Sequence, residues 1–157
     1  MSVNWLTGQQ LNKLILANAN DTTNAAFIGI FAIDTLPQCI STLPLLLIVN
    51  NDTSNLPGRH WKAIFISAER HGEVFDSLAT PVSLTLEKWM NTFTLKWICS
   101  NLIIQHPLSP SCGGFVLHYI LHRVKEMSLK QYTEKYFVSD VLKNENIVRR
   151  FVCKLRK

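Results

Sequence analysis

The sequence lacks the long apolar run that a membrane-spanning helix needs. Its longest apolar stretch, Leu43 to Val49, is too short to cross a bilayer and contains Pro44. The first residues, Met1 to Trp5, show no signal-peptide pattern. We therefore expect a soluble protein that is not secreted and that lies inside the cell or is carried inside a particle.

Paired cysteines are also missing, although the chain has four cysteines. None forms a CxxC pair, so their spacing indicates neither a zinc site nor a disulfide framework. Cys39, Cys99 and Cys153 are predicted to be small buried or half-buried apolar side chains. Only Cys112 has neighbours that indicate a reactive thiol.

The motifs of common cofactor sites are absent as well. There is no phosphate-binding loop, no dinucleotide fingerprint and no HExxH. His118 and His122 have a spacing that zinc ligands use on a helix, but they are expected on a polar stripe with Lys125 and Glu126. We therefore predict no metal, and no cofactor that the chemistry requires.

What the chain does have is the composition of a globular protein. It has 157 residues, of which 47% are apolar and 17% are charged. No internal repeat or low-complexity linker divides it. These properties predict a single domain over residues 1–157, large enough to bury a core.

Positive charge is concentrated near the C-terminus. Residues 123–157 hold ten of the 16 Lys and Arg residues and four of the 11 Asp and Glu residues, a net +6. This part is predicted to be helical. It is either a solvated helical face or a site for an acidic partner such as DNA. The candidate DNA-binding residues are Arg149, Arg150, Lys154, Arg156 and Lys157.

Hydrophobic periodicity predicts an α+β fold. A helix capped by Thr7 should run to about Ala19 and be broken by residues 20–24. The predicted strands or extended segments are 27–32, 45–49, 60–67, 73–76 and 96–104, with a hairpin connection at 69–72. The other predicted helices are 82–93, a buried helix at 112–127, and further helices that begin near Ser128 or Ser139.

Four residues in this order carry the functional argument: His60, Asp76, Gln105 and Cys112. They supply a base, a group that orients the base, an oxyanion donor and a nucleophile, which a thiol acyl-transfer site needs. Each alone has an ordinary explanation. Together, their order and structural context predict a cysteine protease.

Cys112 is expected at the start of the buried helix. A helix N-terminus offers unpaired N–H groups and a partial positive charge, and both stabilise a thiolate. Gly113 and Gly114 are poor helix formers, so another segment or the substrate backbone is expected to come close there. The alternative is a buried helical cysteine without chemistry.

The partners of Cys112 are expected to converge from two strands and a loop. His60 follows a turn at Gly58 and opens a strand, and Asp76 ends the neighbouring one. Glu73 competes with Asp76 for the orienting role but alternates to the opposite strand face. The Gln105 amide could pair with the Cys112 backbone N–H to bind an oxyanion.

These residues resemble the adenovirus-type cysteine endopeptidase family (adenain), which is related to the ubiquitin-like-specific proteases. The resemblance covers about residues 25–120. It is carried by Gly58-Arg59-His60-Trp61, by Val74-Phe75-Asp76-Ser77, and by Gln105 seven residues before Cys112-Gly113. It implies the four roles given above, a mixed sheet packed by helices, and support of the substrate or oxyanion by Trp61 and Gly113.

The resemblance also implies a biological role. Family members cleave viral precursor proteins during maturation, so the implied substrates are capsid or core precursors. The implied locations are the virion and the host nucleus or cytoplasm. DNA and a short peptide stimulate adenoviral members. Two residues depart from the pattern: Asp76 stands where those enzymes have Glu, and Cys99 does not match the spacing of their peptide-binding cysteine.

Two alternatives remain open from the sequence. One is a ubiquitin-like-modifier isopeptidase with the same chemistry, although Ser111 stands where that family commonly has Asp. The other is a non-catalytic DNA-binding scaffold with a decayed site, which the basic C-terminal part favours.

Overall fold

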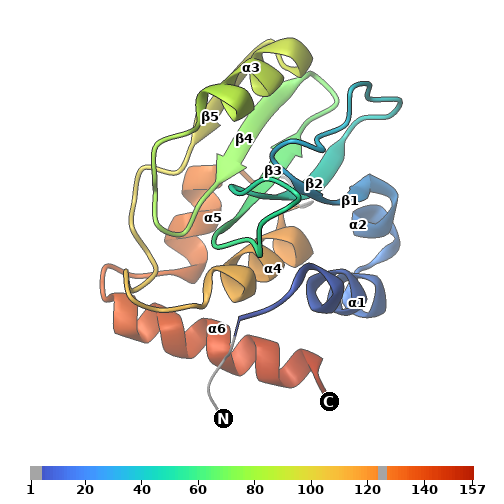
Figure 1. The fold of residues 1–157 in the computed structure, drawn as a ribbon. Helices are drawn as coiled ribbons and strands as arrows, with labels where there is room; N and C mark the ends of the chain where they lie inside the picture. Colours follow the sequence, from blue (N-terminus) through green and yellow to red (C-terminus); the bar gives the residue numbers. More distant parts are fainter. Residues whose placement is uncertain (1–4, 124–126) are drawn as a thin grey trace.

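A five-stranded mixed sheet with helices on both faces forms the framework of the protein (Figure 1). The computed structural model describes residues 5–123 and 127–157. The strands are β1 (Phe27–Ala32), β2 (Leu45–Asn50), β3 (Trp61–Ile66), β4 (His71–Phe75) and β5 (Lys96–Cys99). The helices are α1 (Gly8–Asn18), α2 (Asp21–Ala26), α3 (Leu84–Phe93), α4 (Cys112–His122), α5 (Leu129–Tyr136) and α6 (Val141–Leu155). The predicted α+β class is confirmed.

The strands lie in the sheet in the order in which they occur in the chain, β1-β2-β3-β4-β5. Strand β3 pairs antiparallel with β2 and with β4, whereas each edge strand, β1 and β5, is parallel to its neighbour. Strand β2 is buried along its whole length, as its continuous apolar sequence predicts. The centre of the sheet is therefore the most rigid support available for a site.

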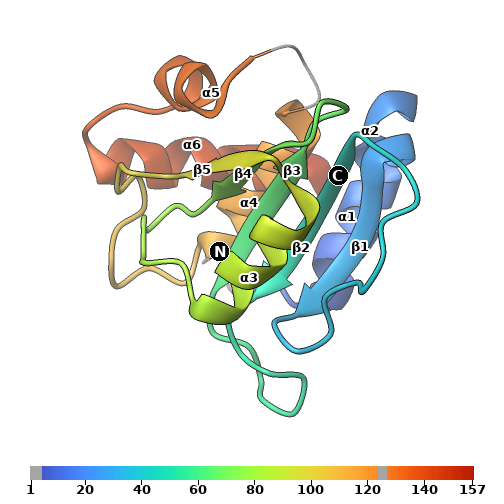
Figure 2. The same cartoon turned by 90° about the horizontal axis from the view of Figure 1, so that it is seen from above.

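Side chains alternate from one face of the sheet to the other and build two cores. Leu46 and Ile48 of β2 join the core under α1, α4 and α6, while Leu45 and Leu47 join the core under α3. Figure 2 shows α3 on one side of the sheet and α4 with α6 on the other. Every strand residue between the two layers is thus held by packing as well as by hydrogen bonds.

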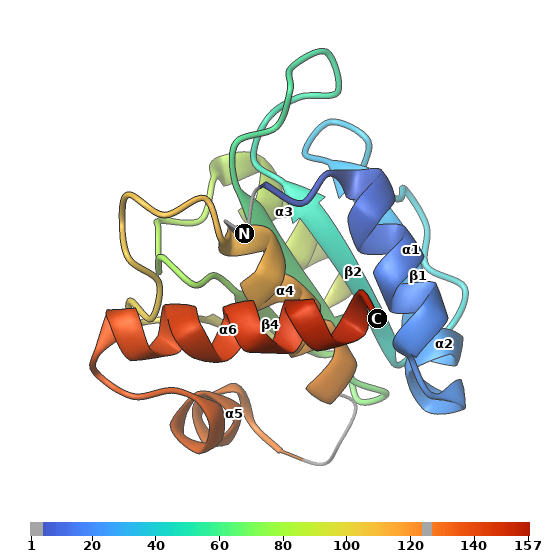
Figure 3. The same ribbon diagram turned by 90° about the horizontal axis from the view of Figure 1, so that it is seen from below.

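The C-terminal helix is part of the core, which the sequence did not indicate. Helix α6 crosses α4 on the side away from the sheet (Figure 3). A Cβ atom on Gly114 would lie 2.6 Å from Val148 Cγ1, so the absence of a side chain lets the two helices approach. The predicted close approach at Gly114 is confirmed. Val148 and Val152 are buried on this side.

Several predicted boundaries were wrong for identifiable reasons. Helix α1 ends at Asn18, so the predicted break at 20–24 is confirmed, but the short helix α2 that follows was missed. Asn20 caps α2 by accepting a hydrogen bond from the Thr23 N–H at 2.8 Å. The hairpin turn is tighter than predicted. It closes with Arg70 at φ 63°, and β4 begins at His71.

Two elements end earlier than predicted. Strand β5 stops at Cys99, because the next residues turn to carry the chain along the end of β4, where the Ser100 N–H donates to the Val74 carbonyl at 3.0 Å. Helix α4 ends at His122; the part of its predicted extension at 124–126 lies outside the described residues. The later helices are capped by Ser128, as predicted, and by Asp140 instead of Ser139.

The burial of two residue types also differs from expectation. Cys39, Cys99 and Cys153 are exposed, because they lie in a loop, on an edge strand and on the outer side of α6. His118 is buried instead of lying on a polar stripe, and its Nδ1 is 2.7 Å from the Tyr132 hydroxyl. Lys125 and Glu126, expected beside it, lie outside the described residues.

A buried carboxylate ties α4 to the sheet. Glu73 of β4 accepts hydrogen bonds at 2.7 Å from the Tyr119 hydroxyl and from both Arg123 Nε and Nη2. It also accepts from the Leu129 N–H at 3.1 Å. As predicted, Glu73 faces away from Asp76, and its partners make it structural.

Over residues 5–123 and 127–157, none of the helices has both the length and the apolar character that crossing a membrane requires.

We predict that Glu73→Ala lowers the free energy of unfolding by about 3–5 kcal/mol, because it removes the carboxylate opposite a buried guanidinium. Urea unfolding followed by circular dichroism measures this. Glu69→Ala, an exposed carboxylate on the same hairpin, is the matched control and should leave the midpoint unchanged. Equal midpoints for both variants would contradict a structural role for Glu73.

Candidate active site

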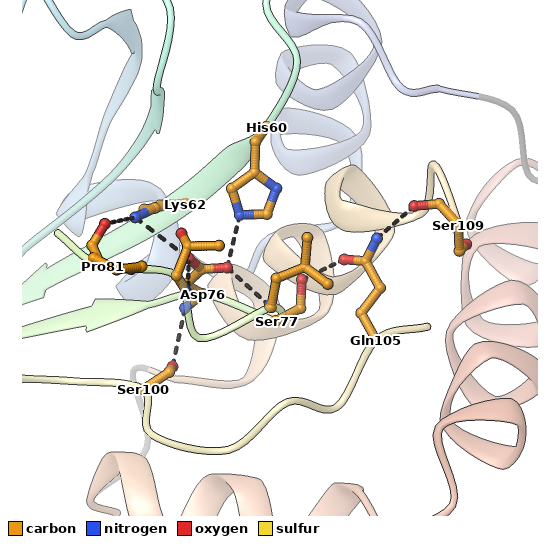
Figure 4. Close-up of polar contacts among 10 residues, drawn as sticks. His60, Lys62, Asp76, Ser77, Pro81, Ser100, Gln105 and Ser109 are labelled. Atoms are coloured by element: carbon orange, nitrogen blue, oxygen red, sulfur yellow. Dashed lines mark hydrogen bonds and ion pairs between the residues drawn. The ribbon is translucent and has the colours of Figure 1, made fainter. Parts of the chain in front are cut away.

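The pairing of β3 with β4 brings the predicted base and its orienting carboxylate together. Ala63 pairs with Phe75 in antiparallel register, so the residues before Ala63 lie beside those after Phe75. His60 therefore meets Asp76, and its Nε2 lies 2.7 Å from Asp76 Oδ1 (Figure 4). Because a carboxylate only accepts, this contact places the ring proton on Nε2 and leaves Nδ1 for the thiol.

Asp76 is held by more groups than the sequence indicated. Its Oδ1 accepts from the Leu78 N–H at 2.9 Å, and its Oδ2 accepts from the Thr80 N–H at 3.0 Å and from the Thr80 hydroxyl. Lys62, which is also buried, places Nζ 3.3 Å from Oδ2. The carboxylate thus cannot rotate without breaking several hydrogen bonds at once.

The charges of the pair are coupled. Burial by itself raises the pKa of Asp76, but the hydrogen bond and charge of His60, with the bonds from Thr80 and Leu78, hold that pKa well below its usual range. Burial lowers the pKa of His60, yet the hydrogen bonds to Asp76 and Cys112 outweigh it and raise the pKa to about 9. An imidazolium opposite a carboxylate is the favoured state at neutral pH.

The predicted nucleophile begins α4. Cys112 is the first residue of the helix and is 3% exposed, so only a small area of the residue reaches the cleft. His60 lines the same cleft, and a hydrogen bond to the Cys112 thiol is among the causes that raise the pKa of His60. Cys112 and Gly113 contribute the first N–H groups at this end of the helix, whereas the Gly114 and Phe115 N–H groups donate to the Ser111 carbonyl at 2.8 and 3.2 Å.

The N-terminal segment packs over the start of α4. A Cβ atom on Gly113 would lie 2.9 Å from Leu6 Cβ and 3.5 Å from Trp61 Cδ1. The indole of Trp61 donates from Nε1 to the Leu6 carbonyl at 3.0 Å. The predicted close approach at Gly113 is therefore made by the protein's own chain, and Trp61 holds that chain in place.

Gln105 is fixed by residues that the sequence analysis missed. Ser77, the residue after Asp76, donates its hydroxyl to Gln105 Oε1 at 2.6 Å, and its carbonyl accepts from the Gln105 N–H at 3.1 Å. Gln105 Nε2 donates to the Ser109 carbonyl at 2.7 Å. One short segment, Asp76-Ser77, therefore positions both the orienting carboxylate and the predicted oxyanion donor. Single serines carry no signal that would have identified them.

His60, Gln105 and Cys112 line one cleft of about 590 Å³, with Asp76 behind the histidine. The cleft walls also include Trp5, Arg59, Leu78, Pro81, Leu108 and Pro110. The structure thus brings the four predicted residues to one place. Their catalytic roles stay a prediction.

Other candidate residues lie away from this cleft. The candidate DNA-binding residues Arg149, Arg150, Lys154, Arg156 and Lys157 are exposed on or just after α6. The His118 and His122 rings stack at 4.1 Å within an aromatic cluster instead of facing a common ligand. In the described part of the chain, no group of three His, Cys, Asp or Glu side chains is arranged to hold a metal ion.

Comparison with known proteins supports the fold by structure and not by sequence. No protein-family model matches the chain, and no curated protein sequence does. The ASFV pS273R protease superposes with a TM-score of 0.63 at 16% identity over 92% of this chain. The central domain of the uncharacterized Lpg1148 protein from Legionella pneumophila gives 0.54 at 12% identity, over 98% of this chain and 97% of that one.

A third similar structure is ChlaDub1 from Chlamydia trachomatis, with a TM-score of 0.50 at 16% identity, over 97% of this chain and 78% of that one. Two ASFV pS273R protease structures are covered over 43% and 66% of their length, so this chain spans less than two thirds of that enzyme. The chain therefore shares its fold, a mixed sheet packed by helices, with the ASFV pS273R protease.

We predict that Asp76→Asn lowers the pKa of His60 from about 9, because it removes the carboxylate that stabilises the imidazolium. NMR titration of the His60 ring nitrogens measures this, with Glu69→Gln as a control of equal charge change. Since the His60 pKa of about 9 lies above the ordinary histidine pKa of 6.5, protonated His60 stabilises the folded state fully below pH 6.5, and this stabilisation is lost as the pH rises toward 9. An unchanged His60 titration in Asp76→Asn would refute the coupling.

Proposed function

We propose that the protein is a cysteine endopeptidase that uses Cys112, His60 and Asp76 as a triad and Gln105 in the oxyanion hole. One observation carries the proposal: a histidine hydrogen-bonded to a firmly anchored carboxylate interacts with a helix-N-terminal cysteine in a shared cleft. A buried structural cysteine does not require this arrangement. The fold shared with the ASFV pS273R protease supports the same class of activity.

In the proposed reaction, neutral His60 takes the Cys112 proton on Nδ1, which gives the thiolate together with the imidazolium that the raised pKa of His60 favours. The thiolate then attacks the carbonyl carbon of the scissile peptide bond. The carbonyl oxygen becomes an oxyanion, which accepts hydrogen bonds from the Cys112 N–H and from the second Nε2 hydrogen of Gln105. The His60 imidazolium then protonates the leaving amine as the C–N bond breaks. Water, deprotonated by His60, hydrolyses the remaining thioester and regenerates the thiol.

For substrates, we propose viral or virus-like precursor proteins, such as capsid or core proteins, cleaved during maturation in the virion or in the host nucleus or cytoplasm. Support comes from the adenain-like motifs and from the fold shared with the ASFV pS273R protease. A ubiquitin-like-modifier isopeptidase is the second candidate, favoured by the match to ChlaDub1 over 97% of this chain. Cleavage of modifier conjugates but not of structural precursors would favour the second candidate.

DNA is proposed as a partner of the exposed, basic side of α6, and a peptide activator is a further proposal that the adenain resemblance supports. Arg149, Arg150 and Lys154 are exposed, whereas Val148 and Val152 of the same helix are buried. Polyanion binding at this surface leaves the core contacts of α6 intact. If the catalytic site is inactive, a DNA-binding scaffold is the remaining function for the chain.

We predict that an electrophilic thiol probe labels Cys112 selectively and that Cys112→Ala and His60→Ala both lose the adduct, because the thiol reacts as the thiolate that His60 produces. Intact mass and peptide mapping give the readout. Cys153→Ala, which removes an exposed thiol, is the matched control and should keep the Cys112 adduct. Labelling that is lost only in Cys112→Ala, with His60→Ala equal to wild type, would refute the activated pair.

We predict that replacing Arg149, Arg150 and Lys154 by Gln weakens DNA binding and reduces the slope of log K against log salt by roughly 2–3, about 0.9 for each lost phosphate contact. Charge variants are preferable to truncation because α6 packs in the core. Lys13→Gln, on the exposed side of α1, is the control. The same slope for the triple variant and wild type would exclude this surface.

A further inference from the structure

The loop between β5 and α4 carries Gln105 and is held from outside by two consecutive residues of α6. The first is Asn144, which is fully buried. Its Nδ2 donates to the Ile104 carbonyl at 3.0 Å and to the Val138 carbonyl at 2.7 Å, and its Oδ1 accepts from the Val138 N–H at 2.9 Å. Asn144 therefore fixes the backbone of the residue directly before Gln105.

The second residue is Glu145, whose carboxylate has three partners in the same loop. Its Oε1 accepts from the His106 N–H at 3.0 Å, which fixes the residue directly after Gln105. Its Oε2 accepts from the Ser109 hydroxyl at 3.0 Å and from the Ser111 hydroxyl at 2.7 Å. The loop is thus attached to α6 on both sides of Gln105 and again next to Cys112.

These attachments reach both proposed oxyanion donors. The Ser109 carbonyl accepts from Gln105 Nε2, so the position of Ser109 sets the direction of that amide. The peptide group that joins Ser111 to Cys112 carries the Cys112 N–H, and Ser111 makes no side-chain capping bond to α4. Its hydroxyl is directed to Glu145 instead. A single carboxylate on α6 therefore constrains the two groups that would bind the oxyanion.

We propose that Glu145 is a positioning residue for the oxyanion hole, acting through Ser109 and Ser111, with Asn144 as its structural support. The proposal rests on the proposed function and extends the catalytic apparatus to α6. Oxyanion donors are effective only when held close to the position where the charge develops, and a misplacement of about 1 Å costs on the order of 100-fold in rate. Glu145 itself contacts no reacting atom and leaves the Cys112–His60 pair unaltered.

The test separates acyl transfer from simple alkylation by the same thiol. Hydrolysis of an N-acylglycine p-nitrophenyl ester passes through an oxyanion. Alkylation by iodoacetamide does not, because the sulfur forms a bond to a saturated carbon as iodide leaves with the electron pair. In Glu145→Gln we expect kcat for the ester to fall about 10–100-fold, and the rate of Cys112 alkylation, followed by peptide mapping, to stay within about twofold of wild type.

Two further variants keep the test valid if Glu145→Gln does not fold. Ser109→Ala and Ser111→Ala each remove one hydrogen bond to the carboxylate, and each should show the same separation of the two rates with a smaller loss in kcat. Glu87→Gln, on the exposed side of α3, is the control for loss of a carboxylate and should match wild type in both reactions.

The outcomes distinguish this proposal from the one on which it rests. A selective fall in ester hydrolysis supports it. The proposal is overturned if Glu145→Gln hydrolyses the ester as fast as wild type, because Glu145 is then dispensable. It is also overturned if both rates fall in parallel and the unfolding midpoint is lower, because Glu145 is then only structural. If wild type hydrolyses the ester no faster than Cys112→Ala does, the proposed function is overturned, and this inference is overturned with it.

Discussion

The site depends on one hydrogen bond, between His60 Nε2 and Asp76 Oδ1. It joins the start of β3 to the end of β4 and fixes which ring nitrogen faces Cys112. The bond is maintained because the Asp76 carboxylate is held from the opposite side by Thr80 and by the buried ammonium group of Lys62. The register of β3 with β4 makes this contact possible, and the contact in turn sets the orientation and the charge of the His60 ring.

The nucleophile is placed by close packing as well as by the hydrogen bonds that attach its loop to α6. Helix α4 enters the core with two glycines in its first turn, and each permits an approach that a side chain would block. At Gly113 the N-terminal segment comes close, and at Gly114 helix α6 does. Close-packed interiors transmit displacement, so the position of Cys112 depends on segments at both ends of the chain.

The sequence predicted the parts of this arrangement that have a local signal. The apolar run of β2, the cap at Thr7, and the order of His60, Asp76, Gln105 and Cys112 were all readable. The features that the sequence did not predict depend on contacts between residues that are distant in the sequence. Nothing in the sequence indicated the buried contact of Lys62 with Asp76, and the basic C-terminal part gave no sign that α6 packs in the core; both are fixed by partners distant in the chain.

The most direct test of the account is to identify the acyl-enzyme. The protein would be mixed with an N-acylglycine p-nitrophenyl ester, quenched in acid within its first turnovers, and mapped by mass spectrometry. The account predicts one acyl group, on the Cys112 sulfur. Acylation shared among Cys39, Cys99 and Cys153, with none on Cys112, would contradict it, because exposed thiols would then be more reactive than the one paired with His60.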